Sequence, residues 1–240
     1  MRLDKYLVAQ GHFESRNRAL EAIRSGAVTV DGRQPKASQA VSEKNNIEIT
    51  LEKFYVSRAA RKLEAFLQSY PLDIQGRQAV DIGSSTGGFA QILLEQGVAS
   101  LHCVDVGSDQ LHHSLRADPR LSLYEETDIR VFQPPHPFDL VTCDVSFISI
   151  LQITEEIDRL CKKDADIVIL YKPQFEVGRE TKRDSKGVVQ DLDAIVKCKE
   201  AFESETAKLG WRERYHIASQ IQGKEGNQEY LYHFVKTTER

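Results

Sequence analysis

The stretch AVDIGSSTGGFAQILLEQG, residues 79–97, decides the fold of the larger part of the chain. It reads as a short apolar strand, a glycine-rich turn and an amphipathic helix. Gly83 is followed by three other residues and then by the pair Gly87 and Gly88. This spacing lacks the G-x-G-x-x-G of a dinucleotide fingerprint, and no Lys followed by Ser or Thr closes the glycines as in a P-loop. The turn therefore predicts a ligand that is held without a phosphate-binding loop.

Strand and helix signals alternate through the rest of this region. Such alternation predicts an α/β fold with a doubly wound, Rossmann-like parallel sheet. The last two strands are joined by the polar loop QGKEGN and predict a terminal antiparallel hairpin. The strand signals are QAVDI, SLHCVDV, LSLYE, FDLVTCD, DADIVILY, RYHIASQI and EYLYHFVK, with a helix expected over 192–209 between the fifth and the sixth.

The first fifty residues predict a separate, small α+β domain. Ser15 can cap the second of its helices, and Gly26 follows that helix where a left-handed residue is expected. Asp31 and Gly32 form a tight turn between two extended pieces. The expected elements are helices over 2–10 and 15–25 and strands over 27–30 and 46–50.

Charge is distributed unevenly along the chain, although the overall net charge of −4 argues mildly against nucleic acid. Residues 1–62 carry 12 Lys or Arg against 7 Asp or Glu, net +5, whereas residues 63–240 carry 20 against 29, net −9. We place the first domain at 1–53, a linker at 54–57 and the second domain at 58–240. A basic module in front of an acidic body suggests a docking element for a polyanion.

The sequence shows no signal for a membrane segment or a metal site. No apolar run approaches the roughly 20 residues of a membrane helix, and the N-terminus MRLDKYLVAQG is charged where a signal peptide is apolar. We expect a cytoplasmic protein with no disulfide, no zinc site and no other metal, and we interpret His112 and His113 as surface residues. The four cysteines show no C-x-x-C spacing; they are Cys103, Cys143, Cys161 and Cys198.

The glycine turn and the next strand together predict the ligand. In an open doubly wound sheet, ligands bind beyond the carboxyl ends of the strands. Asp105, at the end of the following strand, can accept hydrogen bonds from both ribose hydroxyls of an adenosine. An apolar strand ending in D-x-G-x-x-x-G, with a second acidic residue about twenty positions on, is typical of methyltransferases that use S-adenosylmethionine. The alternative is a turn with a purely structural role.

Several motifs resemble known families. RLDKYLVAQG, FESRNRALEAIRSGAVTVDG and NNIEITL resemble the alpha-L RNA-binding module. DIGSSTGGF, VDVG, TDIR, CDVSF and YKPQFEVG resemble the FtsJ-like ribosomal RNA 2'-O-methyltransferases, and the whole chain resembles the TlyA family, often labelled hemolysin A. The resemblance implies S-adenosylmethionine as cofactor. Asp105 would bind its ribose, Asp128 would face its adenine, and the glycine turn would line its binding site. The expected cofactor-binding residues are Asp81, Gly83, Gly87, Phe89, Asp105 and Asp128.

Methylation of a ribose hydroxyl requires a group that takes the proton of a weakly nucleophilic alcohol. A lysine can do so where its surroundings favour the neutral amine, and Lys172, at the carboxyl end of DADIVILY, is the best-placed candidate. The FtsJ-like family uses a Lys-Asp-Lys-Glu tetrad, and four positions of this sequence match it. The expected catalytic residues are Lys62, Asp144, Lys172 and Glu229.

Each of these positions also has a less specific interpretation. Lys62 could be a solvated helix lysine, and Asp128 a turn carboxylate after a strand. Glu229 could be a charge that protects an edge strand, and Glu225 competes with it for the fourth place of the tetrad. The polar loop 179–187 could be an ordinary solvated loop or could contact phosphates.

The resemblance implies 2'-O-methylation of cytidine in ribosomal RNA. The partners would be ribosomal RNA or ribosomal subunits, with no membrane and no obligate protein partner, and phosphate attraction would supply most of the affinity. The leading RNA contacts are Lys5, Arg16 and Arg18. The alternatives are a pore-forming cytolysin, for which the sequence shows no signal or membrane-length segment, and a non-catalytic RNA-binding protein, which the presence of all four tetrad positions disfavours.

Overall fold

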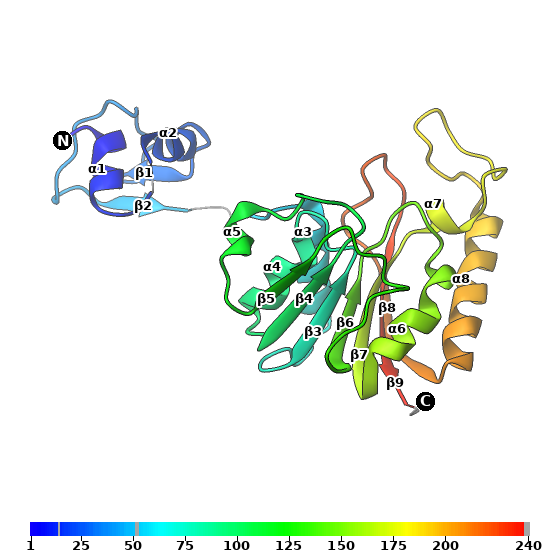
Figure 1. Cartoon of the computed structure of the whole chain (residues 1–240). Coiled ribbons are helices and arrows are strands. Elements are labelled where there is room, and N and C mark those ends of the chain that lie inside the picture. Colours follow the sequence, from blue (N-terminus) through cyan, green and yellow to red (C-terminus); the bar gives the residue numbers. More distant parts are fainter. Residues whose placement is uncertain (14, 51–52, 238–240) are drawn as a thin grey trace. The chain divides into compact units, whose positions relative to one another are not determined.

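The computed structural model describes residues 1–13, 15–50 and 53–237. The chain divides into two compact units, Met1–Phe54 and Tyr55–Arg240, each with its own core. Of the motifs quoted from the sequence, Glu14 in FESRNRALEAIRSGAVTVDG and Leu51 in NNIEITL lie outside the described residues. Figure 1 colours the two units along the chain, from blue to red.

The first unit packs two helices against a two-stranded antiparallel sheet (Figure 1). The predicted cap is confirmed, since Ser15 Oγ accepts a hydrogen bond from the Arg18 amide at 3.4 Å. Apolar side chains at helical spacing, such as Leu3 and Leu7, are fully buried and form its core. The elements are α1 (Leu3–Ala9), α2 (Arg16–Arg24), β1 (Val28–Val30) and β2 (Ile47–Ile49).

Within the described residues, the second unit is built on a seven-stranded sheet in the order β5-β4-β3-β6-β7-β9-β8 (Figure 1). The first five strands of this order are parallel, and β9 is antiparallel to both β7 and β8, which confirms the doubly wound sheet and its terminal hairpin. The strands are β3 (Gln78–Ile82), β4 (Ser100–Val104), β5 (Leu121–Tyr124), β6 (Phe138–Cys143), β7 (Cys161–Tyr171), β8 (Trp211–Ala218) and β9 (Tyr230–Lys236).

Helices cover both faces of this sheet. Strand β7 shows the two faces directly: Ile167 and Ile169 pack with one hydrophobic core, and Val168 and Leu170 pack with the other. α3 and α4 cover the face of Val168, and α6 and α8 cover the face of Ile167. The helices are α3 (Arg58–Ser69), α4 (Gly88–Glu95), α5 (His113–Arg116), α6 (Thr154–Leu160), α7 (Pro173–Glu176) and α8 (Leu192–Lys208), with a 3-10 turn η1 (Ile150–Gln152).

Local details refine the sequence predictions. Strand β9 begins at Tyr230, so Glu229 precedes the strand and does not begin it. Strand β9 also lies inside the sheet, between β7 and β8, which makes the interpretation of Glu229 as an edge-strand charge wrong. No helix among the described residues combines the length and apolar character needed to span a membrane. The cysteines are free thiols.

Candidate active site

The glycine turn after β3 has a backbone that only glycine adopts easily. Gly83 has a φ of +75°, and Gly87, the N-cap of α4, has a φ of +90°. A Cβ atom at Gly83 would lie 3.0 Å from the carbonyl oxygen of Asp144, and one at Gly87 would lie 2.7 Å from Leu111 Cδ1. At Gly83 the turn therefore passes close to the end of β6, whereas at Gly87 it packs against the side chains of Leu111 and Leu115, so a side chain at either position would displace the turn or its neighbours.

Asp105 holds the turn from the neighbouring strand. Its Oδ2 accepts a hydrogen bond from the Ser85 amide, and its Oδ1 accepts one from the Gly107 amide, each at 2.7 Å. Ser85 has a positive φ of 45°, so this bond also stabilises a strained residue. Each carboxylate oxygen has a second lone pair, which leaves Asp105 able to accept bonds from a ligand.

Asp105 and the turn line a cavity of about 430 Å³, here called the turn cavity. Asp128 lies in its wall, and Arg130 donates to it from both its amide and its side chain at 2.5 to 3.1 Å. Hydrogen bonding to the Arg130 side chain lowers the pKa of Asp128 to about 2, so this carboxylate is ionised at neutral pH. Apolar side chains, including Val104 and Ile129, complete the wall.

A second cavity of about 570 Å³, here called the tetrad cavity, is lined by all four predicted tetrad residues. Lys172 Nζ lies 2.6 Å from Asp144 Oδ1, and Lys62 forms an ion pair with Glu229. Lys62 is 6% exposed and Glu229 is 3% exposed, so the interpretation of Lys62 as a solvated helix lysine is wrong. The fold thus brings together side chains from α3, from the ends of β6 and β7 and from the residue before β9.

Neighbouring polar groups fix these two ion pairs. Lys172 Nζ donates to Ser146 Oγ at 2.7 Å, and Gln174 Nε2 donates to Glu229 Oε1 at 2.8 Å. Burial raises the pKa of Asp144 above its usual range, although the charge of Lys172 opposes this. Glu225 also lines the tetrad cavity, but it is exposed.

Asp81 lies at the end of β3 and lines the same cavity. It is 1% exposed; its Oδ1 accepts a hydrogen bond from Thr142 Oγ1 at 2.7 Å, and its Oδ2 has no hydrogen-bond partner among the described residues. Burial, only partly offset by Thr142, raises the pKa of Asp81 to about 7. Ser84 Oγ, in the turn itself, is likewise buried without a partner in the described part of the chain.

These observations fit S-adenosylmethionine. The turn cavity offers carboxylates and apolar walls for an adenosine, and it shares Gly83, Ser85 and Asp144 with the tetrad cavity. The buried polar atoms of Asp81 and Ser84 belong to residues that line the tetrad cavity at the glycine turn, and they match the polar amino-acid end of such a ligand. Phe89 is 2% exposed, belongs to the hydrophobic core on the α3 and α4 face of the sheet and also lines the tetrad cavity.

Sequence reasoning missed three residues of the site. Phe147 is 87% exposed, has a φ of +69° and lines both cavities. Its ring lies 5.2 Å from that of Phe175 between centroids. Ser146 and Gln174, which contact the tetrad, were missed as well. The signal was available, since these residues lie in the motifs CDVSF and YKPQFEVG.

The predicted RNA contacts of the first unit differ in how they are engaged. Lys5 is exposed, and its ammonium group forms no hydrogen bond or ion pair with the described residues of this unit. Arg16 lies 2.7 Å from the buried carboxylate of Asp4, whose pKa hydrogen bonds from Arg2 and Arg16 lower to about 2. Arg18 lies 3.6 Å from Glu21. Lys5 is therefore the most available of the three.

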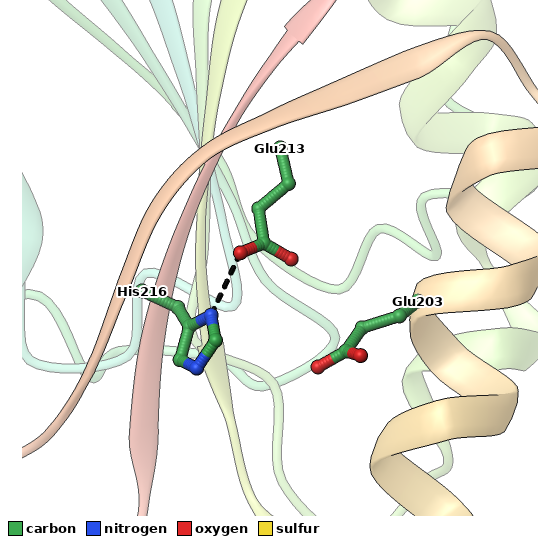
Figure 2. A group of neighbouring side chains, drawn as sticks. All are labelled: Glu203, Glu213 and His216. Atoms are coloured by element: carbon green, nitrogen blue, oxygen red, sulfur yellow. Dashed lines mark hydrogen bonds and ion pairs between the residues drawn. The ribbon is translucent and has the colours of Figure 1, made fainter.

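Figure 2 shows one group of potential metal ligands among the described residues: Glu203, Glu213 and His216. His216 Nδ1 lies 2.7 Å from Glu213 Oε1, and Glu203 accepts a hydrogen bond from the Tyr232 hydroxyl at 2.8 Å. The ring of His216 also stacks on that of Tyr232. These contacts account for the group, and none of its members lines either cavity. That the reaction needs no metal stays a prediction.

Comparison with known proteins places the chain in a family. A profile described as FtsJ-like methyltransferase matches residues 55–236, and one described as S4 domain matches residues 1–47. The 23S rRNA (cytidine-2'-O)-methyltransferase TlyA of Campylobacter jejuni is 44% identical over 98% of this chain and 100% of the relative.

Two further relatives match over nearly the whole chain. The 16S/23S rRNA (cytidine-2'-O)-methyltransferase TlyA of Mycobacterium tuberculosis is 38% identical over 100% of this chain and 91% of the relative. Hemolysin A of Brachyspira hyodysenteriae is 34% identical over 98% of this chain and 100% of the relative. The chain therefore belongs to the TlyA family of FtsJ-like, S-adenosylmethionine-dependent methyltransferases.

Proposed function

We propose that this protein transfers a methyl group from S-adenosylmethionine to the ribose 2'-hydroxyl of a cytidine in ribosomal RNA. One observation carries the proposal: two ion pairs, the buried Lys62–Glu229 and the largely buried Lys172–Asp144, line a cavity that shares its wall with the glycine turn. Charged side chains withdrawn this far from water are costly to maintain, so the gathering of four of them at the carboxyl ends of the strands favours a catalytic role.

The residues of the turn cavity would hold the cofactor, which supplies an electrophilic methyl group when bound. Asp105 would accept hydrogen bonds from the ribose hydroxyls, and Asp128 would face the adenine. Gly83 and Gly87 keep the turn low enough for a close approach. Asp81, with an unpartnered oxygen among the described residues, would receive the cationic amino group of the methionine end.

Lys172 is our candidate for the group that removes the proton of the 2'-hydroxyl. Its Nζ must be neutral to accept that proton, and the nearby Asp144, whose pKa burial raises, can share a proton with it. Ser146 Oγ fixes the direction of the amine. Nζ would accept the proton that the 2'-oxygen loses, and Asp144 would stabilise the positive charge that then lies on Nζ. The cofactor would supply the methyl carbon, whose bond to the sulfonium sulfur breaks with the electron pair remaining on sulfur.

Lys62 and Glu229 would position the substrate beside this pair. Gln174 holds Glu229 from the other side, so the carboxylate has one orientation with respect to the cavity. The geometry favours Glu229 over the exposed Glu225 as the fourth member of the tetrad. Phe147, exposed at the junction of the two cavities, offers a ring on which the target base could stack.

The first unit would supply RNA affinity, with Lys5 as its most available cation. We retain the division into a module at 1–53, a linker at 54–57 and a methyltransferase domain at 58–240. The substrate would be ribosomal RNA in the cytoplasm, either free or within a ribosomal subunit. Electrostatic contacts of the module would make binding dependent on salt.

Single-turnover methylation tests the function and the role of Lys172 together. The wild-type protein, incubated with radiolabelled S-adenosylmethionine and purified small or large ribosomal subunits, should label a ribose 2'-oxygen. Lys172→Ala should slow methyl transfer by about 10² to 10⁴ at saturating substrate while leaving cofactor affinity unchanged. The control is Lys163→Ala, an exposed lysine on the same strand. A Lys172→Ala rate within about threefold of wild type, well short of the general-base range, would remove Lys172 from this role.

A further inference from the structure

We propose that Lys186 and Lys224 bind two phosphates of the RNA strand next to the target nucleotide, and so hold its ribose over the tetrad cavity. This inference rests on the proposed function and deepens it. Lys186 lies in the loop between α7 and α8, and Lys224 lies in the loop between β8 and β9. Both side chains line the tetrad cavity.

Lys186 and Lys224, like Arg58 of the same cavity, have no structural task, whereas Lys62 and Lys172 are held in ion pairs. Both lysines of the proposed pair are exposed, and neither ammonium group forms a hydrogen bond or ion pair with a described residue. Arg183, by contrast, donates to the carbonyl oxygens of Gln174 at 2.9 Å and Gly178 at 3.2 Å. Arg183 therefore stabilises its own loop, whereas Lys186 and Lys224 remain available to a ligand.

The backbone that carries Lys186 is held by local hydrogen bonds. Asp184 Oδ1 accepts bonds from the amides of Lys186 at 2.8 Å and Val188 at 2.9 Å. The Gly187 amide donates to the Asp184 carbonyl oxygen at 3.0 Å. The loop thus has a defined turn that presents Lys186 at the rim of the cavity.

Asn227 connects this loop to the one that carries Lys224. Its Oδ1 accepts a bond from the Val189 amide at 3.0 Å, and its Nδ2 donates to the Gly187 carbonyl oxygen at 3.4 Å. Asn227 is 7% exposed, and its own carbonyl oxygen accepts a bond from the Gly223 amide at 2.8 Å. The two lysines therefore stand on linked loops, which favours a pair of contacts to one ligand.

The positive charges of Lys186 and Lys224 favour an anion as their ligand. The tetrad itself is balanced, with Lys62 and Lys172 facing two carboxylates, so the rim lysines are not needed to neutralise it. Glu225 is the carboxylate beside them at the rim, and the two ammonium groups outnumber it. An RNA strand carries one phosphate per nucleotide. If the target ribose lies at the tetrad, the phosphates on its two sides can each contact one of the two lysines.

Salt-dependent RNA binding tests the inference. Binding of a short fluorescein-labelled single-stranded RNA to the full-length protein is measured between about 50 and 200 mM salt, a range in which phosphate contacts dominate the change. The slope of log K against log salt is negative, and each lost phosphate contact should reduce its magnitude by about 0.7. Binding should therefore weaken about fivefold at about 0.1 M salt. Lys186→Ala and Lys224→Ala should each show this change, and the double variant should show about twice the slope change.

The matched control is Lys182→Ala, because Lys182 is an exposed lysine of the same loop that lines neither cavity. Its slope should equal that of the wild type; an equal loss in all three variants would overturn the inference, since a general basic loop would then suffice. A loss of S-adenosylmethionine affinity without a slope change would assign the lysines to the cofactor carboxylate instead and would also overturn it. Wild-type protein that methylates no ribosomal subunit would refute the proposed function, while the slopes would still report on these two lysines.

Discussion

Replacement of Asp81 by Asn should stabilise the methyltransferase unit in a manner that depends on pH. The side chain is 1% exposed, and burial raises its pKa from 3.8 to about 7. Asn has the same shape, and its amide oxygen can still accept the hydrogen bond from Thr142 Oγ1 that Asp81 Oδ1 accepts at 2.7 Å. The substitution therefore removes a buried titration without creating a cavity.

The sign follows from proton binding. Between about pH 4 and pH 7 the folded state keeps the proton on Asp81 while the unfolded chain has lost it, so wild-type stability falls as the pH rises through this window. At about 1.4 kcal/mol per pKa unit, the free energy of unfolding of the wild type should fall by about 3 kcal/mol between about pH 5 and pH 8. The free energy of unfolding of Asp81→Asn, relative to wild type, should rise by this amount over the same interval.

Urea unfolding followed by tryptophan fluorescence measures this difference. Trp211 is the single tryptophan of the chain, is 3% exposed and belongs to the core of the second unit, so its emission reports on that unit alone. Asp139→Asn is the control: burial raises the pKa of Asp139, but Lys162, the Gln78 amide and Arg77 together lower it below its usual value, so the effect of the substitution should be constant from about pH 5 to pH 8. If the difference between Asp81→Asn and wild type does not vary with pH, Asp81 does not titrate as the structure implies.

Two further predictions concern the ligands. Asp105→Ala should weaken S-adenosylmethionine binding by about 1 to 3 kcal/mol in calorimetry, because charged hydrogen bonds to the ribose and to the Ser85 amide are lost; unchanged affinity would exclude Asp105 from the ribose site. Deletion of residues 1–53 should leave cofactor affinity intact and reduce both RNA affinity and its salt dependence, as measured by fluorescence titration, whereas an unchanged salt slope would show that the module makes no phosphate contacts.

Most of the fold was predictable because its signals are local. The alternation of apolar strands with amphipathic helices over 78–171 follows from burial of β-strands on both faces, and the positive φ values of Gly83 and Gly87 follow from the spacing of the turn. The terminal hairpin was predictable from its two strands and polar loop. Short elements such as α7 could not be predicted, because a helix of four residues shows too little periodicity to be recognised in the sequence.

The sequence by itself determined which residue types stand at the strand ends, because parallel strands present their carboxyl ends at one edge of the sheet. Only the tertiary structure decided which of them meet: Lys62 and Glu229 are 167 positions apart, and no local pattern specifies their ion pair. It also decided that Glu229 is buried while Glu225 is exposed, and that Phe147 lies open at the junction of two cavities. Burial and long-range contacts set these outcomes, since they depend on how helices and loops pack around the sheet rather than on the spacing of neighbouring residues.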